Sequence, residues 1–178
     1  MKNDNNIRIM KKLYFTIITV FLITSSAAGQ YGTRQAGLRL GYRGGIFYQV
    51  TQEAGTAEMG YNALLSFNNN GLQITGLKVI YETTISSISD NLYFAWGYGG
   101  HAGFIYTDHV EYFGESYYYK GDRFSPLIGA DGWLALEYRI REIPLNVSLN
   151  LKPFVEITIP AFVRIVPFDF AFSVAYVF

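Results

Sequence analysis

The sequence contains no cysteine, only two histidines and no surplus of charge of either sign. The absence of cysteine excludes disulfides and thiolate chemistry, so the fold must be stable without covalent cross-links. Two histidines without a partnering cysteine also lack the clustering that a zinc site needs. The 14 basic residues are balanced by 14 acidic residues, and they form no basic stripe that could neutralise phosphates. We therefore expect no nucleic-acid partner, and no motif implies a cofactor.

The sequence also lacks an apolar run of the roughly 20 residues that a membrane-spanning helix needs. A shorter apolar run covers residues 13–23, after four basic residues and before a group of small residues at 25–29. This order is typical of a cleaved export signal, so we predict a signal peptide over residues 1–29 and a mature domain over 30–178. Removing the signal takes away four basic residues and one acidic residue, which leaves ten basic and thirteen acidic residues.

Beyond Tyr31 the sequence shows no apolar stripe at helical spacing, but apolar and polar residues alternate repeatedly between turn residues. Such alternation predicts an all-β fold. The expected strands lie at about residues 36–42, 46–51, 58–67, 72–84, 92–106, 128–140, 145–157 and 168–178. Eight is an even number, as a single-chain bacterial barrel requires, so we predict an eight-stranded antiparallel up-and-down transmembrane β-barrel. Ile74 and Leu77 both read as outward-facing, which predicts a bulge at Gly76.

Alternation alone does not say which face of the sheet is inside, because a soluble lipocalin-like barrel would show the same pattern reversed. The polar face here is mostly Gly, Ala, Ser and Asn with few charges, whereas a solvated face would carry many long charged side chains. The other face is rich in aromatic residues, which include Phe94, Trp96, Tyr98, Phe104 and Tyr106 on one strand. We therefore expect the apolar face to contact lipid and the small polar face to line a narrow lumen.

Three segments carry a resemblance to the small outer-membrane barrels of the OmpX and OmpA type: the glycine-rich residues 92–100, the strand 134–138 with its following tight turn, and the C-terminal residues 175–178. The resemblance covers essentially everything after Ala36. It implies that Phe178 ends the last strand as the signal read by the barrel-assembly machinery. It also implies an outer-membrane location, with membrane lipid as the surrounding partner.

Charged residues predicted to point into the lumen are the candidate site. They are Arg39, Glu58, Lys78, Glu82, Asp131, Glu137, Arg139, Lys152, Glu156 and Asp169. Eight strands leave a lumen barely wide enough for side chains, so we favour a plug of mutually compensating ion pairs over a charged conduit. His101 falls on the glycine-rich face of its strand and is expected to be another lumen residue.

The longest predicted connection, residues 107–125, is unusually aromatic. Its candidate binding residues are Tyr112, Phe113, Tyr117, Tyr118 and Tyr119. The segment could be two strands continuing to a turn at residues 120–122, or a protruding edge that binds an extracellular partner. Asp108 and His109 with Ser116 or Ser125 match no hydrolytic motif.

We therefore expect a structural or surface-interaction protein of the outer membrane rather than an enzyme. A lipid-modifying enzyme and a narrow pore are the alternatives.

Overall fold

The computed structural model describes residues 33–54, 57–68, 70–82, 89–112, 115–159 and 162–178. The contacts divide the chain into two compact units, and the unit Gly32–Val177 is the one described below. The predicted signal peptide, residues 1–29, belongs to the other unit and lies outside the described residues. None of the described residues forms a helix long and apolar enough to cross a membrane.

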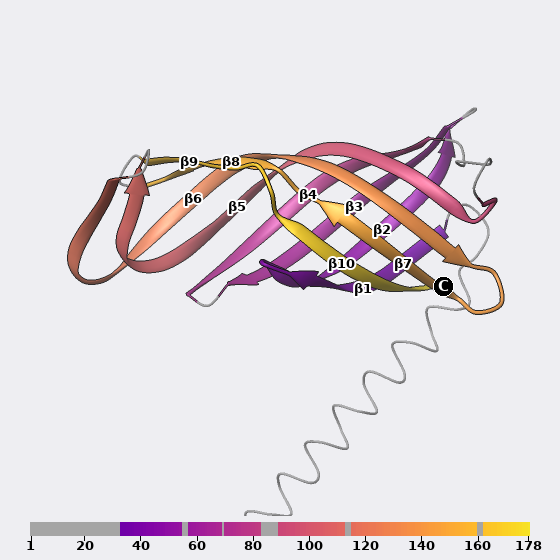
Figure 1. Ribbon diagram of the computed structural model, residues 1–178, viewed down its shortest axis with the longest axis horizontal. Helices are drawn as coiled ribbons and strands as arrows, with labels where there is room; N and C mark the ends of the chain where they lie inside the picture. The colour runs from indigo at the N-terminus through magenta and orange to yellow at the C-terminus, as the bar shows by residue number, and fades with distance from the viewer. Residues whose placement is uncertain (1–32, 55–56, 69, 83–88, 113–114, 160–161) are drawn as a thin grey trace, which may run out of the picture. The chain divides into compact units, whose positions relative to one another are not determined.

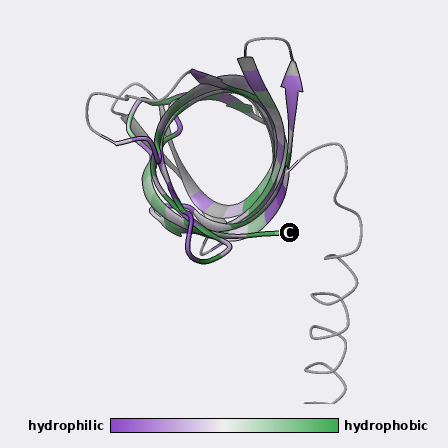
Figure 2. Cartoon of the chain, turned by 90° about the vertical axis from the view of Figure 1, so that its right-hand side faces the viewer, coloured by the Kyte–Doolittle hydropathy of each residue, from purple (hydrophilic) through white to green (hydrophobic). Residues whose placement is uncertain are grey.

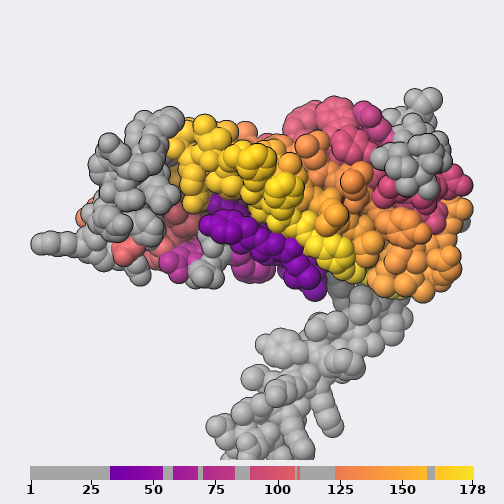
Figure 3. Space-filling view, in the orientation of Figure 1, coloured from indigo at the N-terminus to yellow at the C-terminus, as the bar shows by residue number. Residues whose placement is uncertain are grey.

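The regular structure of the described residues is ten antiparallel β-strands (Figure 1). They are β1 (Thr33–Gly41), β2 (Gly44–Ala54), β3 (Ala57–Asn68), β4 (Gly71–Glu82), β5 (Leu92–Tyr112), β6 (Glu115–Ile140), β7 (Leu145–Leu151), β8 (Phe154–Thr158), β9 (Phe162–Val166) and β10 (Phe170–Val177). Each strand from β1 to β6 pairs with the next, β7 pairs with β10, and β10 pairs with β1. The sheet therefore closes on itself, as the ring of strands in Figure 2 and the contact of β1 with β10 in Figure 3 show.

The ten segments make eight barrel strands, because β7 with β8 and β9 with β10 are each one strand with an interruption. Both β7 and β8 pair with β6, on either side of Lys152 and Pro153. The two interruptions are hydrogen-bonded to each other, since the Lys152 N–H donates to the Asp169 carbonyl at 3.0 Å. The Gly132 N–H donates to the Pro153 carbonyl at 2.8 Å. The predicted eight-stranded antiparallel barrel is confirmed.

The fully buried charged side chains lie inside this barrel, and many large apolar side chains lie outside it. Arg39, Lys152, Glu156 and Asp169 have no exposed surface. The large apolar residues Ile74, Ile128 and Leu149, by contrast, are each more than 60% exposed. This confirms the prediction that the polar face of the sheet lines the lumen and the apolar face points outward.

The interior also contains one apolar cluster, beside the polar groups. Its members are Leu77, Val79, Tyr81, Ala95, Trp133 and Ala135, all buried. Trp133 is the cross-strand partner of Gly97 and packs into this cluster. This packing fills part of the lumen with apolar atoms.

The strands are unequal at the two ends of the barrel. We call the end with Thr33 and Val177 the terminal end, and the opposite end the extended end. At the extended end β5 runs past its last partner in β4, which is Gly71 opposite Ile105, and continues against β6 until Tyr112 faces Glu115. The predicted turn at residues 120–122 is wrong, because β6 continues through these residues and a register shift between Thr107 and His109 takes up the extra ones.

The predicted bulge at Gly76 is also wrong. The pairings of β4 with β3 and with β5 run through Gly76 without a shift. Leu77 is 3% exposed and joins the inner apolar cluster, while Ile74 faces outward. The error arose because an apolar residue at position 77 was assigned to the outer face, whereas the lumen holds apolar residues too. Strand β9, which lies between Pro160 and Pro167, was not predicted.

Candidate functional site

Arg39, on β1, is the most fully engaged charge in the lumen. Its Nη1 atom lies 3.2 Å from Oδ2 of Asp169, and its Nη2 donates to the Asp169 carbonyl at 2.9 Å. Its Nε donates to Oδ1 of Asn150 at 2.8 Å, and its Nη1 also donates to the Arg43 carbonyl at 2.7 Å. Both Arg39 and Asp169 are completely buried. Desolvation of this ion pair is therefore offset by further hydrogen bonds to the same guanidinium.

Lys152, Asp131, His101 and Glu156 form a continuous chain of polar contacts across the lumen. The Lys152 Nζ lies 2.8 Å from Oδ1 of Asp131, and the His101 Nδ1 lies 2.7 Å from Oδ2 of the same aspartate. On its other side, the His101 Nε2 is 3.3 Å from Oε2 of Glu156. All four side chains are completely buried, so each depends on its neighbours for compensation.

His101 is held in place by packing as well as by these polar contacts. Its ring meets the ring of Phe154 edge-on, with the centroids 5.5 Å apart. It also lies against Gly129 on β6, where an added Cβ would collide with the imidazole and with the Val155 carbonyl. Glycine at position 129 is therefore what leaves space for the histidine.

Arg43, in the turn between β1 and β2, brings a second buried guanidinium into the lumen. Its Nη1 donates to Oε1 of Gln73 at 2.7 Å and lies 3.4 Å from Oε2 of Glu156. Its guanidinium carbon is 4.3 Å from the centroid of the Phe154 ring. Arg164 of β9 also contacts Glu156, so two arginines share one carboxylate.

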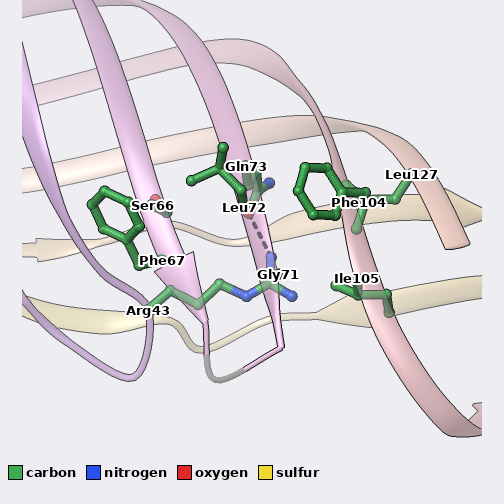
Figure 4. A pocket seen from close by; sticks show the side chains of 9 residues that line it. All are labelled: Arg43, Ser66, Phe67, Gly71, Leu72, Gln73, Phe104, Ile105 and Leu127. Atoms are coloured by element: carbon green, nitrogen blue, oxygen red, sulfur yellow. Dashed lines mark hydrogen bonds between the residues drawn. The ribbon is translucent and has the colours of Figure 1, made fainter. Parts of the chain in front are cut away.

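A cavity of about 10 Å³ lies beside Arg43, lined also by Ser66, Gln73 and Phe104 (Figure 4). This volume is on the order of a single water molecule. The space beside Arg43 is therefore too small for a ligand larger than water.

A second polar cluster lies toward the terminal end. Arg139 makes a two-pronged contact with Glu58 through Nη1 at 3.0 Å and Nη2 at 2.9 Å, and its Nε donates to Glu137 at 2.9 Å. The Tyr81 hydroxyl donates to Glu137 at 3.1 Å and accepts from Gln49 at 2.6 Å. Arg139 also stacks near the rings of Tyr81 and Tyr93.

This terminal-end cluster borders a hollow of about 430 Å³ whose lining includes Thr33, Glu58, Arg139 and Val177. Within the described residues, the lumen thus widens into this hollow at the terminal end. Deeper inside, it is occupied by Tyr81, Trp133 and the buried ion pairs.

Eight of the charges predicted to face the lumen do lie on its inner side. They are Arg39, Glu58, Asp131, Glu137, Arg139, Lys152, Glu156 and Asp169. The direction predicted for Lys78 and Glu82 is wrong. Their neighbours Leu77, Val79 and Tyr81 face the interior, so both charges lie on the outer face, where Glu82 accepts a hydrogen bond from Trp96 at 2.9 Å.

Sequence reasoning missed Arg43, because it lies between the expected strands 36–42 and 46–51, where no alternation assigns a residue to a face. It placed His101 in the lumen but not in contact with charges. The signal that could have linked His101 to the network is the strand register, which places it opposite Gly129, two residues from Asp131. That register is not visible in the sequence.

The backbone of the aromatic segment is strand on both sides of residues 113–114, which lie outside the described part and include Phe113. Tyr112 belongs to β5, and Tyr117, Tyr118 and Tyr119 belong to β6. Of the four residues considered for hydrolysis, Ser125 is buried inside the barrel and Asp108 is exposed, while the side chains of His109 and Ser116 lie outside the described part. Among the described residues, no group of three or more His, Cys, Asp or Glu side chains could hold a metal ion.

Comparison with solved structures finds the N-terminal β-barrel domain of Pseudomonas aeruginosa OprF, with a TM-score of 0.50 and 8% sequence identity. The match covers 84% of this chain and 98% of that domain. The likeness agrees with the closed, eight-stranded antiparallel barrel described above. No family model and no curated protein matches the sequence. At this identity, the likeness to the OprF barrel concerns the fold alone.

Proposed function

We propose that this chain is an outer-membrane β-barrel protein of structural and surface-interaction type, whose lumen is sealed by a plug of buried ion pairs. One observation carries the proposal: the buried charges of the barrel lie inside it, and a belt of large apolar residues is exposed outside. Such a belt would aggregate in water, whereas in a bilayer it matches the surrounding hydrocarbon. Closure of the sheet through β1 and β10 pairs the strand backbone internally, as lipid requires.

The distribution of aromatic residues on the outside supports the same proposal. Phe104, Tyr106 and Phe124 form a cluster with ring centroids 5.4 to 5.9 Å apart, near the extended end. Trp96 and Tyr98 lie on the outer face of β5 nearer the terminal end. Aromatic rings at two levels of a barrel wall are expected where the wall meets the two membrane interfaces.

The ends of the chain fit this location. We infer that residues 1–29 are the export signal, that the terminal end faces the periplasm, and that Phe178, directly after β10, is read by the barrel-assembly machinery. The extended end then faces the outside of the cell. Membrane lipid is the partner that surrounds the wall.

The sealed lumen is tested by conductance. In planar bilayers the purified, folded protein should give no stable unitary current, because Arg39, Lys152 and their partners occupy the cross-section. Insertion must be verified in the same preparation by the heat-shifted gel mobility of a closed barrel. Discrete and reproducible openings by inserted protein would contradict the plug and favour the pore.

The surface-interaction part of the proposal rests on the β5–β6 hairpin, which continues beyond the last β4 partner at Ile105. Strands of this length place Tyr112, Tyr117, Tyr118 and Tyr119 past the rim formed by the shorter hairpins. Tyrosine gives a large contact area with a polar tip and is favoured in interfaces. Loss of surface binding by a barrel that still inserts would be the signature of this role.

A further inference from the structure

Lys78 stands on the outer wall of the barrel, at the margin of a groove that the lumen network does not involve. Strand pairing places Tyr61 of β3 and Tyr98 of β5 on its two sides. Tyr61 is 61% exposed and Tyr98 is 55% exposed, so both rings project from the wall. Lys78 therefore lies between two exposed tyrosines on the outer wall.

The groove beside Lys78 has a volume of about 550 Å³, with Gly76 and Ala63 among its lining residues. These two are directly paired across β3 and β4, and Tyr48 is the partner of Ala63 on the next strand. A Cβ added to Gly76 would have no atom within 4 Å, which shows that the space over this glycine is open. The floor of the groove is formed by small residues and its sides by tyrosines.

Along β4, the charge of Lys78 lies nearer the terminal end of the barrel, and the groove extends from it toward the middle of the strand. Lys78 is four residues from Glu82, where β4 ends near the terminal end, and Gly76 lies two residues farther toward the middle of the strand. A lipid of the periplasmic leaflet has this same order, with its phosphate at the interface and its acyl chains directed toward the bilayer centre. The charge and the groove thus match the two parts of one lipid molecule.

Lys78 also needs a counter-charge from outside the barrel. Within the described ranges, no carboxylate lies within ion-pair distance of its ammonium. An unpaired ammonium on a lipid-facing wall is unfavourable unless it reaches the interface or meets an anion. A lipid phosphate supplies that anion.

On the basis of the membrane location proposed above, we infer that Lys78 and the adjacent groove bind one anionic phospholipid of the periplasmic leaflet. The phosphate contacts the Lys78 ammonium and the hydroxyls of Tyr61 and Tyr98, and an acyl chain lies over Gly76. The bound lipid compensates the charge of Lys78 and covers the groove.

The test is native mass spectrometry of the folded barrel released from nanodiscs that contain equal amounts of dioleoylphosphatidylglycerol and dioleoylphosphatidylcholine. The wild-type barrel should retain one phosphatidylglycerol in preference to phosphatidylcholine. Lys78→Gln removes the charge and should weaken retention of the anionic lipid about tenfold, as expected for loss of a charge-assisted hydrogen bond. Gly76→Leu fills the groove and should cause a comparable loss.

Matched controls are Lys78→Arg, which keeps the charge, Glu82→Gln, which removes another outer-face charge, and Ala102→Leu, which adds a leucine to the outer face outside the groove. All three should retain the lipid. If Gly76→Leu does not fold, Lys78→Gln alone decides. Equal retention by the wild type and Lys78→Gln overturns the lipid site while leaving the membrane barrel intact. A wild type that shows no heat-shifted mobility overturns the membrane proposal, and the lipid site with it.

Discussion

Buried charges of the lumen are stable only as sets, and Arg39 illustrates why. Its guanidinium donates to the side chain of Asn150, to the Arg43 carbonyl, and to both the carboxylate and the carbonyl of Asp169. Removing either charge of such a pair leaves its partner desolvated and uncompensated. Each residue of the network is therefore sensitive to the loss of a neighbour.

Arg39→Ala should lower the free energy of unfolding by about 3–5 kcal/mol, because Asp169 would remain as an unpaired buried charge. Urea titration of the folded barrel in lipid vesicles, followed by gel mobility without heating, measures the change. The double variant Arg39→Met with Asp169→Leu should recover part of the loss, since no unpaired charge remains. A single variant as stable as the wild type would contradict the buried pair.

The contact between His101 and Gly129 gives a second prediction. Gly129→Ala should destabilise the barrel by about 1–3 kcal/mol, because the added methyl group overlaps the imidazole and the Val155 carbonyl. Gly76→Ala is the matched control and should change stability by less than about 0.5 kcal/mol, since its added Cβ meets nothing. The same urea titration compares the two, and equal midpoints for both variants would show that His101 does not occupy this position.

At the scale of the strand, alternation predicted most elements because one face of the sheet points outward and is largely apolar, while the other faces inward. The prediction failed where that rule weakens. Leu77 is apolar yet inward-facing, which led to a wrong bulge at Gly76 and to the wrong face for Lys78 and Glu82. Arg43 was missed because it lies in a turn, where no periodicity exists. Pairing between distant strands, such as Arg39 with Asp169, depends on closure and register, which the sequence alone does not show.

The extended part of the β5–β6 hairpin should be separable from the barrel. Replacing residues 108–122 by Asn-Gly joins Thr107 to Arg123, which already face each other, through a favoured two-residue turn. We expect normal heat-shifted mobility from this variant, because β4 contacts β5 only up to Ile105. Surface binding, measured on intact cells, should fall if the tyrosines carry it. A variant that fails to insert would instead assign the hairpin a structural role.

At the scale of the whole barrel, the central claim is the direction of the wall: apolar side chains toward lipid and polar side chains toward a filled lumen. The two tryptophans of the chain report on both sides at once. Trp96 lies on the outer face of β5, whereas Trp133 is inside and 8% exposed. A soluble barrel built on the same alternation would have the opposite arrangement.

The most direct measurement is quenching of tryptophan fluorescence by brominated acyl chains in vesicles that contain the folded protein. With Trp133→Phe, the remaining Trp96 should be strongly quenched, because its indole faces lipid. With Trp96→Phe, the remaining Trp133 should be quenched much less, because the barrel wall separates it from the acyl chains. Strong quenching of Trp133 together with weak quenching of Trp96 would contradict the account.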